Sequence, residues 1–192
     1  MSGVASVLEH PLVRAADEFA TAAHASIGQL QAFTGFPYSA HTRAVARLVA
    51  RFTSDPEVVA AGHLHDTIED PKVAREVLAS LFGEVVAHLV DEVSSKAPRT
   101  LPNRAARAAF EAARLATISS NGKLLKCCDV TVNMERIVER DVRFARVYVP
   151  EKRLLLPSLT GAPQEALRMA HEAVMAAEAS LSSAVATPRC RP

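Results

Sequence analysis

The sequence predicts an all-α fold, and three features point to that class. Alanine, which has the highest intrinsic helix propensity, is used heavily across the 192 residues. Aromatic residues make up only 5% and tryptophan is absent, whereas strands favour aromatic and β-branched residues. Apolar residues recur at helical spacing along most of the chain, and no segment alternates with strand period for long enough to build a sheet.

The N-terminal half of the chain carries clear signals for helix starts and stops. Phe19 and Ile27 belong to an apolar stripe at helical spacing, and Gly35 with Pro37 interrupts the chain after it. The dipeptide Asp55-Pro56 starts a helix, because an acidic N-cap residue is followed by proline in the first turn. The helices expected here span about residues 12–30, 40–52, 56–66, 72–82 and 84–94.

Proline and glycine also divide the C-terminal half. A polar, proline-bearing loop at 94–103 is long enough to serve as a lid or a binding loop. Asp141 can cap a helix, which Pro150 is expected to kink or restart. Gly161 precedes a last, alanine-rich helix. The helices expected here span about residues 104–118, 122–139, 141–149 and 163–186.

One domain is expected for residues 1–192, because a single hydrophobic core grows until roughly 250–300 residues. The core of this domain is expected over about residues 12–160, with the C-terminal helix at about 163–186 packed on it. The segment 143–159 mixes basic and apolar residues and is a candidate contact in a homo-oligomer.

The charge balance restricts the class of partner. Lys and Arg number 22 against 21 Asp and Glu, so the net charge is +1 and a broad nucleic-acid surface is not expected. No stretch reaches the ~20 apolar residues of a membrane span, and the N-terminus does not resemble a signal peptide. The three cysteines form no paired-cysteine metal pattern, and a cytoplasmic protein is expected.

Polar residues that could carry chemistry occur at three places where a helical core favours apolar ones. His41 lies just inside the second expected helix. A run rich in His, Asp and Glu covers residues 63–70, at the end of the third. Asp129 and Asn133 lie four residues apart within an apolar helix and therefore share a face. Burying such groups without partners would cost several kcal/mol, which favours a shared site.

Two imidazoles and two carboxylates from these places can enclose one divalent metal ion. The candidate donors lie at His41, in the run 63–70 that contains the adjacent pair His65-Asp66, and at Asp129. Imidazole with carboxylate suits Mn, Fe, Zn or Ni, and the two carboxylates favour Mn or Fe. His65 and Asp66 are adjacent, so they can reach one ion only near a helix end. Glu69 and Asp70 follow about one turn later, where a carboxylate could take a proton from water.

Each of these residues also has a simpler structural explanation. Taken alone, His41 fits a capping or core-edge histidine, and Asp129 fits an ion-pair partner for Lys126. The His-Asp dipeptide is common in proteins. The acid-rich turn, combined with two polar residues on one face of an apolar helix, favours a metal site over these separate explanations.

The chain resembles the HD-domain metal-dependent phosphohydrolases. The resemblance is strongest to the single-domain branch related to the RelA/SpoT-type guanosine tetraphosphate (ppGpp) 3′-pyrophosphohydrolases. It covers about residues 15–160 and keeps its segments in the order typical of that branch. The matching segments are Gly28-Gln29, Thr34 to Tyr38 before His41, Val45-Ala46, Ala60-Ala61 before His65 to Asp70, Phe82-Gly83, and Lys123 through Asp129 to Asn133.

This resemblance implies an all-helical HD-domain bundle that holds one divalent ion, with Mn²⁺ favoured and Fe, Zn, Ni or Mg as alternatives. It implies that His41, His65, Asp66 and Asp129 hold this ion. It also implies that Glu69 and Asp70 position or activate the attacking water and that Asn133 lies near the substrate. The residues expected to bind the substrate are Gln31, Tyr38, Lys96, Arg104 and Lys123. The charged ones among them also fit a solvated helix face or loop.

Three departures from the family pattern fall on the substrate side. Gln31-Ala32 stand where the family usually carries Arg-Lys, Phe36 replaces an acid, and Pro71 replaces a threonine. We therefore expect a metal-dependent phosphohydrolase that cleaves a phosphoester or pyrophosphate of a nucleotide-like small molecule, with ppGpp as one candidate. The alternatives are a non-hydrolytic nucleotide-binding or regulatory module, and an HD scaffold that runs a different metal reaction.

Overall fold

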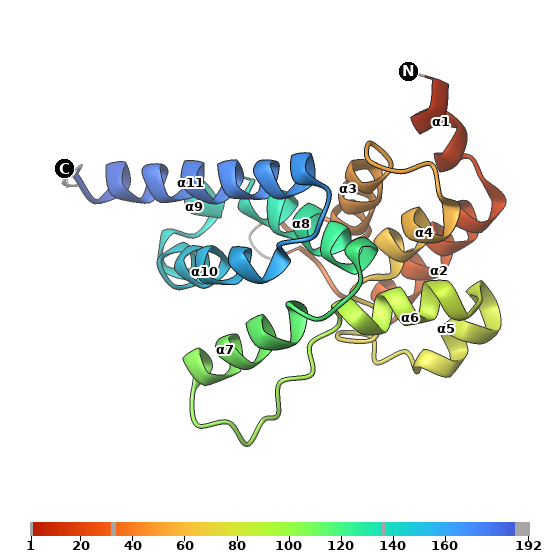
Figure 1. Cartoon of the computed structure of the whole chain (residues 1–192), viewed down its shortest axis with the longest axis horizontal. Coiled ribbons are helices and arrows are strands. Elements are labelled where there is room, and N and C mark those ends of the chain that lie inside the picture. Colours follow the sequence, from red (N-terminus) through yellow and green to blue (C-terminus); the bar gives the residue numbers. More distant parts are fainter. Residues whose placement is uncertain (1, 32–33, 136, 187–192) are drawn as a thin grey trace.

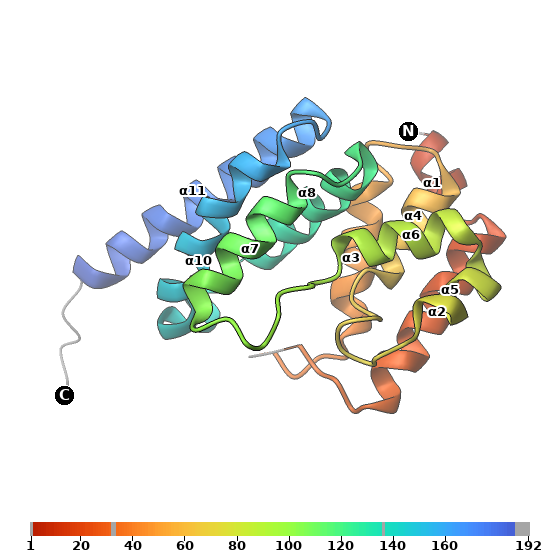
Figure 2. The ribbon, with the colours of Figure 1, turned by 60° about the horizontal axis from the view of Figure 1, so that its bottom comes forward.

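Helix α8 (Ser120–Met134) runs through the middle of the molecule, between two groups of helices (Figures 1 and 2). The computed structural model describes residues 2–31, 34–135 and 137–186. Within these residues there are two isolated β-bridges and no named strand, so the predicted all-α class is confirmed.

The first group contains the helices up to α6. The second group contains α7, which lies between α6 and α8 in the chain, and all helices after α8. The first group consists of α1 (Ser2–Leu8), α2 (Pro11–Ser26), α3 (Ser39–Val49), α4 (Pro56–Leu64), α5 (Arg75–Phe82) and α6 (Glu84–Val93). The second consists of α7 (Arg104–Leu115), α9 (Ile137–Arg140), α10 (Val142–Leu155), the 3₁₀-helix η1 (Leu156–Leu159) and α11 (Gln164–Ala186).

Helix α4 is the most deeply buried element of the first group. Seven consecutive residues, from Val58 to Leu64, are buried, and the helix packs against α2, α3 and α6. Its contact with α3 is close, because a Cβ atom added to Gly62 would lie 3.1 Å from the Cα atom of Ala46. Because the two helices pack this closely, the C-terminal end of α4, which His65 follows, lies near His41 in the first turn of α3.

The long C-terminal helix α11 packs along α8 and α10 (Figure 1). Its buried face is made of small apolar side chains, which allow the helices to approach closely. These side chains are Ala166, Ala170, Val174 and Ala177. No helix in the described part of the chain is both long and apolar enough to cross a membrane.

Two boundaries in the first group differ from the sequence prediction. Helix α2 ends at Ser26 instead of about residue 30, because Leu30 forms an antiparallel bridge with Pro37 across a tight loop. Helix α5 begins at Arg75 instead of about residue 72, because Lys72 adopts a left-handed conformation with φ of 61°. The short helix α1 was not predicted at all.

Two further differences lie in the second group. The helix expected over 122–139 is two elements, since α8 ends at Met134 and α9 follows as a separate short helix. Pro150 does not restart a helix, because α10 continues through it to Leu155. Pro150 lies on the exposed side of α10, where the carbonyl group that loses its intrahelical partner can reach water.

Candidate metal centre and substrate cavity

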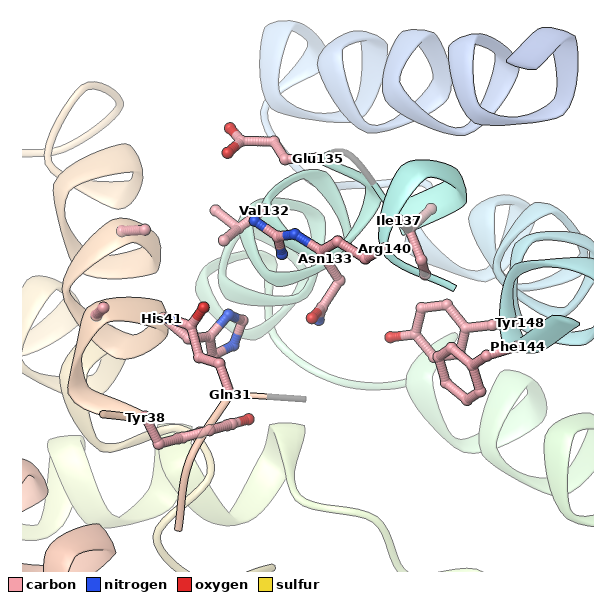
Figure 3. A pocket seen from close by; sticks show the side chains of 12 residues that line it. Gln31, Tyr38, His41, Val132, Asn133, Glu135, Ile137, Arg140, Phe144 and Tyr148 are labelled. Atoms are coloured by element: carbon pink, nitrogen blue, oxygen red, sulfur yellow. The ribbon is translucent and has the colours of Figure 1, made fainter. Parts of the chain in front are cut away.

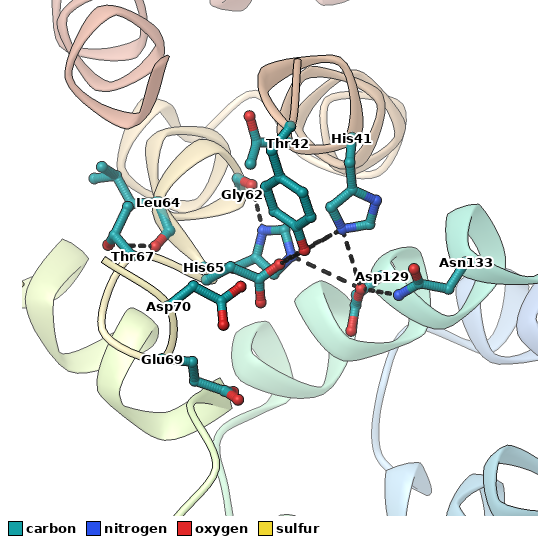
Figure 4. A network of polar contacts seen from close by, with 12 residues as sticks. His41, Thr42, Gly62, Leu64, His65, Thr67, Glu69, Asp70, Asp129 and Asn133 are labelled. Carbon is teal, nitrogen blue, oxygen red and sulfur yellow. Dashed lines mark hydrogen bonds and ion pairs between the residues drawn. The ribbon is translucent and has the colours of Figure 1, made fainter. Parts of the chain in front are cut away.

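Two buried imidazoles from different helices face each other at the centre of the site. His41 lies in the first turn of α3, and His65 directly follows the last residue of α4. Their Nε2 atoms are 3.3 Å apart (Figure 4). Both side chains are almost fully buried, so the shared space between the two nitrogen atoms is shielded from bulk water.

The hydrogen bonding of His65 selects the tautomer that a metal ligand needs. Its Nδ1 atom lies 2.9 Å from the carbonyl oxygen of Gly62, which can only accept a hydrogen bond. Nδ1 therefore carries a proton, and Nε2 is the nitrogen that faces His41 and the cluster. Although burial lowers the pKa of His65, the Asp66 and Asp129 carboxylates raise it to about 10, so in the metal-free protein Nε2 holds a proton whose place a metal ion would take.

Two carboxylates complete the cluster from two further directions. Asp66 Oδ2 lies 3.0 Å from His65 Nε2 and 3.7 Å from His41 Nε2. Asp129, on the buried face of α8, places Oδ1 at 3.5 Å from His41 Nε2 and 3.7 Å from His65 Nε2. The structure thus brings together the four residues that the sequence predicted as ligands (Figure 4).

This donor set fits a divalent metal ion. The candidate ligand atoms of His41, His65 and Asp66 all lie within 4.8 Å of one another, and Asp129 borders the same space. Two nitrogen and two oxygen donors, all largely buried, are the chemistry that Mn, Fe, Ni or Zn accepts.

Each carboxylate is also held by a residue outside the cluster. The Tyr38 hydroxyl donates to Asp66 Oδ2 at 2.5 Å. The Asn133 amide donates to Asp129 Oδ1 at 2.5 Å, and the Lys126 ammonium lies 3.2 Å from Asp129 Oδ2. Asp129 therefore also forms the ion pair with Lys126 that the sequence suggested as an alternative. It does so through Oδ2, while Oδ1 faces the two histidines. Such outer contacts fix the orientation of ligands.

The charges around the cluster keep both carboxylates ionised. Burial alone raises the pKa of Asp129, but the Lys126 charge and the hydrogen bonds from His41 and His65 hold that pKa well below its usual range. Burial also raises the pKa of Asp66, but the charge and hydrogen bond of the neighbouring His65 outweigh burial, so the pKa of Asp66 is lowered overall. Two ionised carboxylates beside two imidazoles make a cavity that favours a cation.

Glu69 and Asp70 lie in the turn that follows α4. This turn is closed by Thr67, whose backbone N–H and hydroxyl both donate to the carbonyl of Leu64. Figure 4 shows both carboxylates directed toward the space between this turn and α8. The Glu69 carboxylate accepts a hydrogen bond from the backbone N–H of Ser95 at 2.8 Å, and burial raises its pKa. It therefore suits a proton acceptor.

Asp70 is oriented by a contact from the loop before α3. The Gln29 amide nitrogen donates to Asp70 Oδ2 at 2.7 Å. Gln29 Oε1 in turn lies 2.6 Å from Nδ1 of the buried His24. Because the amide oxygen can only accept, His24 Nδ1 carries a proton and fixes which way the amide faces.

A cavity of about 370 Å³ opens beside the metal cluster (Figure 3). Tyr38 and His41 lie on one side of it, and Phe144 and Tyr148 lie on the opposite side. The two aromatic rings on α10 stack with centroids 5.0 Å apart. The other labelled side chains of the lining are Gln31, Val132, Asn133, Glu135, Ile137 and Arg140.

The residues predicted to bind substrate are not all brought to this cavity. Gln31 and Tyr38 line it, whereas Ala32 lies outside the described residues. Lys96 pairs with Asp91, away from the cavity. The two others are also engaged elsewhere. Lys123 donates to the carbonyl of Thr160 at 2.8 Å, and Arg104 pairs with Glu151 beside a second cavity.

Several residues at the site were not singled out from the sequence. Phe144 and Tyr148 face the metal cluster across the cavity, although the sequence placed them in a segment expected to pack on the core. Gln29 and Lys126, which the sequence analysis named without giving them a role in the site, contact predicted site residues directly. The sequence held no distinctive signal for Tyr148 and Lys152, because an aromatic residue four positions before a lysine is typical of an ordinary amphipathic helix.

The comparisons with known proteins define the class. The profile of the HD-domain family matches residues 16–152, so the chain belongs to the HD-domain family. The resemblance indicated by the sequence is confirmed for the family.

Within that family, segments of this chain are similar to proteins named as guanosine-3′,5′-bis(diphosphate) 3′-pyrophosphohydrolases. A probable guanosine-3′,5′-bis(diphosphate) 3′-pyrophosphohydrolase of Synechocystis is 41% identical over 85 residues, which are 44% of this chain and 11% of that protein. The Vibrio cholerae guanosine-3′,5′-bis(diphosphate) 3′-pyrophosphohydrolase is 49% identical over 61 residues, 32% of this chain and 9% of that protein. This chain therefore spans only a small part of the length of these relatives.

A solved structure shares the fold over nearly its whole length. It is described as a metazoan ortholog of SpoT that hydrolyses ppGpp. It matches with a TM-score of 0.76 at 21% identity, covering 86% of this chain and 95% of that one. A Listeria monocytogenes structure matches with a TM-score of 0.61 at 22% identity, covering 74% of this chain and 99% of that one.

Proposed function

We propose that this protein is a metal-dependent phosphohydrolase that cleaves a phosphoester or pyrophosphate bond of a nucleotide-like small molecule. The observation that carries the proposal is the convergence of His41, His65, Asp66 and Asp129, from three separate parts of the chain, beside the carboxylates of Glu69 and Asp70. Catalysis of this kind needs a cation site next to a group that can take a proton from water.

A divalent ion at the four ligands, with Mn²⁺ as the first candidate and Fe, Zn, Ni or Mg as alternatives, would lower the pKa of water and neutralise phosphoryl oxygens. The chain's own residues then have distinct tasks. Glu69 accepts the proton of the attacking water, because its raised pKa brings it closer to neutral pH. Asp70, held by Gln29, orients that water, and the Asn133 amide faces the substrate beside Asp129.

The substrate class follows from the cavity and from the relatives. Aromatic rings of Tyr38, Phe144 and Tyr148 border the cavity and can pack against a nucleoside base. Arg140 supplies a cation at its rim for a phosphate group. Relatives whose names specify guanosine-3′,5′-bis(diphosphate) make ppGpp the first substrate to assay. The absence of the Arg-Lys pair at Gln31-Ala32 makes a broader nucleotide panel necessary.

Metal analysis of the purified protein, followed by an assay of phosphate and pyrophosphate release across a nucleotide panel, tests this proposal. Wild-type protein loaded with Mn²⁺ is expected to release product, and the variant Asp66→Ala is expected to release none. Asp91→Asn serves as the matched control, because Asp91 is an acid that pairs with Lys96 away from the cluster. A metal-loaded wild type that binds a nucleotide tightly without forming product would instead establish the non-hydrolytic binding module.

A further inference from the structure

A second cavity of about 300 Å³ lies next to Glu69 and is separate from the aromatic cavity described above. It is bordered by the loop after α6, by α7, by α8 and by α10, and of these α7 and α10 lie next to each other in both views of the ribbon (Figures 1 and 2). Its charged lining residues are Glu69, Arg104, Arg107, Glu111, Lys126, Glu151 and Lys152.

Two lysines of this cavity come from different helices and sense each other's charge. Lys126 on α8 has only 13% of its side chain exposed and reaches Asp129 in the metal cluster. Lys152 on α10 is partly buried, and burial together with the nearby Lys126 charge lowers its pKa. The carboxylates of Asp129, Glu151 and Glu69 act on Lys152 in the opposite direction without cancelling this effect, so an anion bound near both ammonium groups would relieve their repulsion.

The Lys152 ammonium contacts an aromatic ring instead of a carboxylate. Among the described residues its ammonium contacts the face of the Tyr148 ring, 4.7 Å from the centroid, and makes no ion pair. Such a contact orients the ammonium without cancelling its charge. Because Tyr148 also lines the aromatic cavity, this ring connects the two cavities.

Two of the three carboxylates that line the cavity are engaged by arginines, and the third, Glu69, accepts a hydrogen bond from the Ser95 backbone and interacts with the Lys126 charge. Glu151 accepts a two-point ion pair from the Arg104 guanidinium. Glu111 accepts hydrogen bonds from Nε and Nη2 of Arg114, at 2.9 and 2.8 Å, and from the backbone N–H of Lys96 at 2.6 Å. The cavity therefore keeps at Lys152 a positive charge that forms no ion pair among the described residues, next to Lys126, whose charge is shared with Asp129 and Glu69.

We propose that the cavity between Lys126 and Lys152 is an anion subsite that binds a phosphate group of the substrate beyond the one at the metal cluster. The proposal rests on the proposed function, and it narrows the substrate class to nucleotides that carry a diphosphate. The reacting phosphate would lie beside Glu69 and the metal cluster, and its neighbouring phosphate would lie between the two ammonium groups. Lysine ammoniums bind phosphate oxygens through charge-assisted hydrogen bonds.

Calorimetric titration of the full-length, metal-free protein with inorganic pyrophosphate, and separately with orthophosphate, tests the subsite without any turnover. We expect wild-type protein to bind pyrophosphate, and Lys152→Gln and Lys152→Met to weaken this binding roughly tenfold or more. Lys152→Arg is expected to retain most of it, because the charge is kept. Thermal unfolding of each variant verifies that the fold is intact.

Arg153→Gln is the matched control. It removes one positive charge from the neighbouring position of α10, where the side chain is exposed and pairs with Glu178. Its affinity for pyrophosphate is expected to stay within about twofold of wild type. Absence of pyrophosphate binding to the wild type would overturn the proposal, as would equal weakening in Arg153→Gln and Lys152→Gln. Since the measurement needs neither metal nor turnover, failure of the proposed hydrolysis would appear separately, as binding without product.

Discussion

The two walls of the site differ in how completely their charges are partnered. The metal wall, formed by His41, His65, Asp66 and Asp129, is a closed network in which each carboxylate also has a partner outside the cluster. The wall on α10, formed by Phe144, Tyr148 and Lys152, presents aromatic faces and an ammonium that makes no ion pair within the described part of the chain. This contrast indicates that the chain itself preorganises one wall, whereas the other wall, under the proposed function, would gain its missing partner from a bound ligand.

The metal wall is therefore expected to be intolerant of substitution. Asp66→Ala removes a ligand oxygen and leaves the His65 and His41 nitrogens without the acid that faces them both. We expect metal content to fall to near zero and kcat/KM to fall by roughly a thousandfold or more, because both water activation and charge neutralisation are lost. Metal analysis and steady-state assays measure this change. Metal retention at wild-type level would show that the ligand set is wrong.

Glu69 lies at the border between the two walls and gives the next largest effect. Glu69→Gln keeps the size of the side chain but removes the proton acceptor, so kcat is expected to fall about 10²–10⁴-fold with unchanged metal content. Because burial raises the pKa of Glu69, activity of the wild type should decline as the pH falls through that raised pKa. The residual activity of the variant should lack this acidic limb. If the variant kept the same decline of activity at acidic pH, that decline would belong to the titration of a group other than Glu69.

Gln29 tests whether the orientation of Asp70 matters beyond the metal ligands. Gln29→Met retains the volume of the side chain and removes the hydrogen bond to Asp70. We expect kcat to fall about tenfold with little change in KM or metal content, because only the orientation of the attacking water is disturbed. Gln164→Met, on an exposed residue at the start of α11, is the control. Equal kinetics for the two variants would argue against this role.

The smallest effect is expected on the α10 wall. Tyr148→Leu removes an aromatic face from the cavity, so KM for a nucleotide substrate should rise roughly three- to tenfold while kcat changes little. Metal content should remain at the wild-type level, which separates this wall from the metal wall. A large fall in kcat with constant KM would instead assign Tyr148 to the chemistry.

The same contrast explains what could be predicted from the sequence. Asp129 and Asn133 stood out because polar groups within an apolar helix need a partner, and the turn after His65 stood out through its density of acids. Tyr148 and Lys152 gave no such signal, because an aromatic residue and a lysine on an amphipathic helix are typical of ordinary packing. Only the packing of α10 against α7 and α11 places them at the site.

Helix boundaries follow a similar rule. The all-α class and most helices were predictable, because apolar spacing and capping residues such as Asp55 are local. The end of α2 depends on the bridge between Leu30 and Pro37, and the late start of α5 depends on the positive φ of Lys72. Both are consequences of tertiary contacts and turn geometry that local helix propensity does not contain.

The central claim is that one divalent ion at the four-ligand cluster enables phosphohydrolysis. The most direct measurement is the yield of pyrophosphate from ppGpp, followed as Mn²⁺ is titrated into metal-free protein. The account predicts no product without metal, a rate that rises linearly to one equivalent of ion and then stays constant, and no response in Asp129→Ala. Full activity in the presence of a chelator, or no product from any nucleotide of the panel at saturating metal, would contradict it.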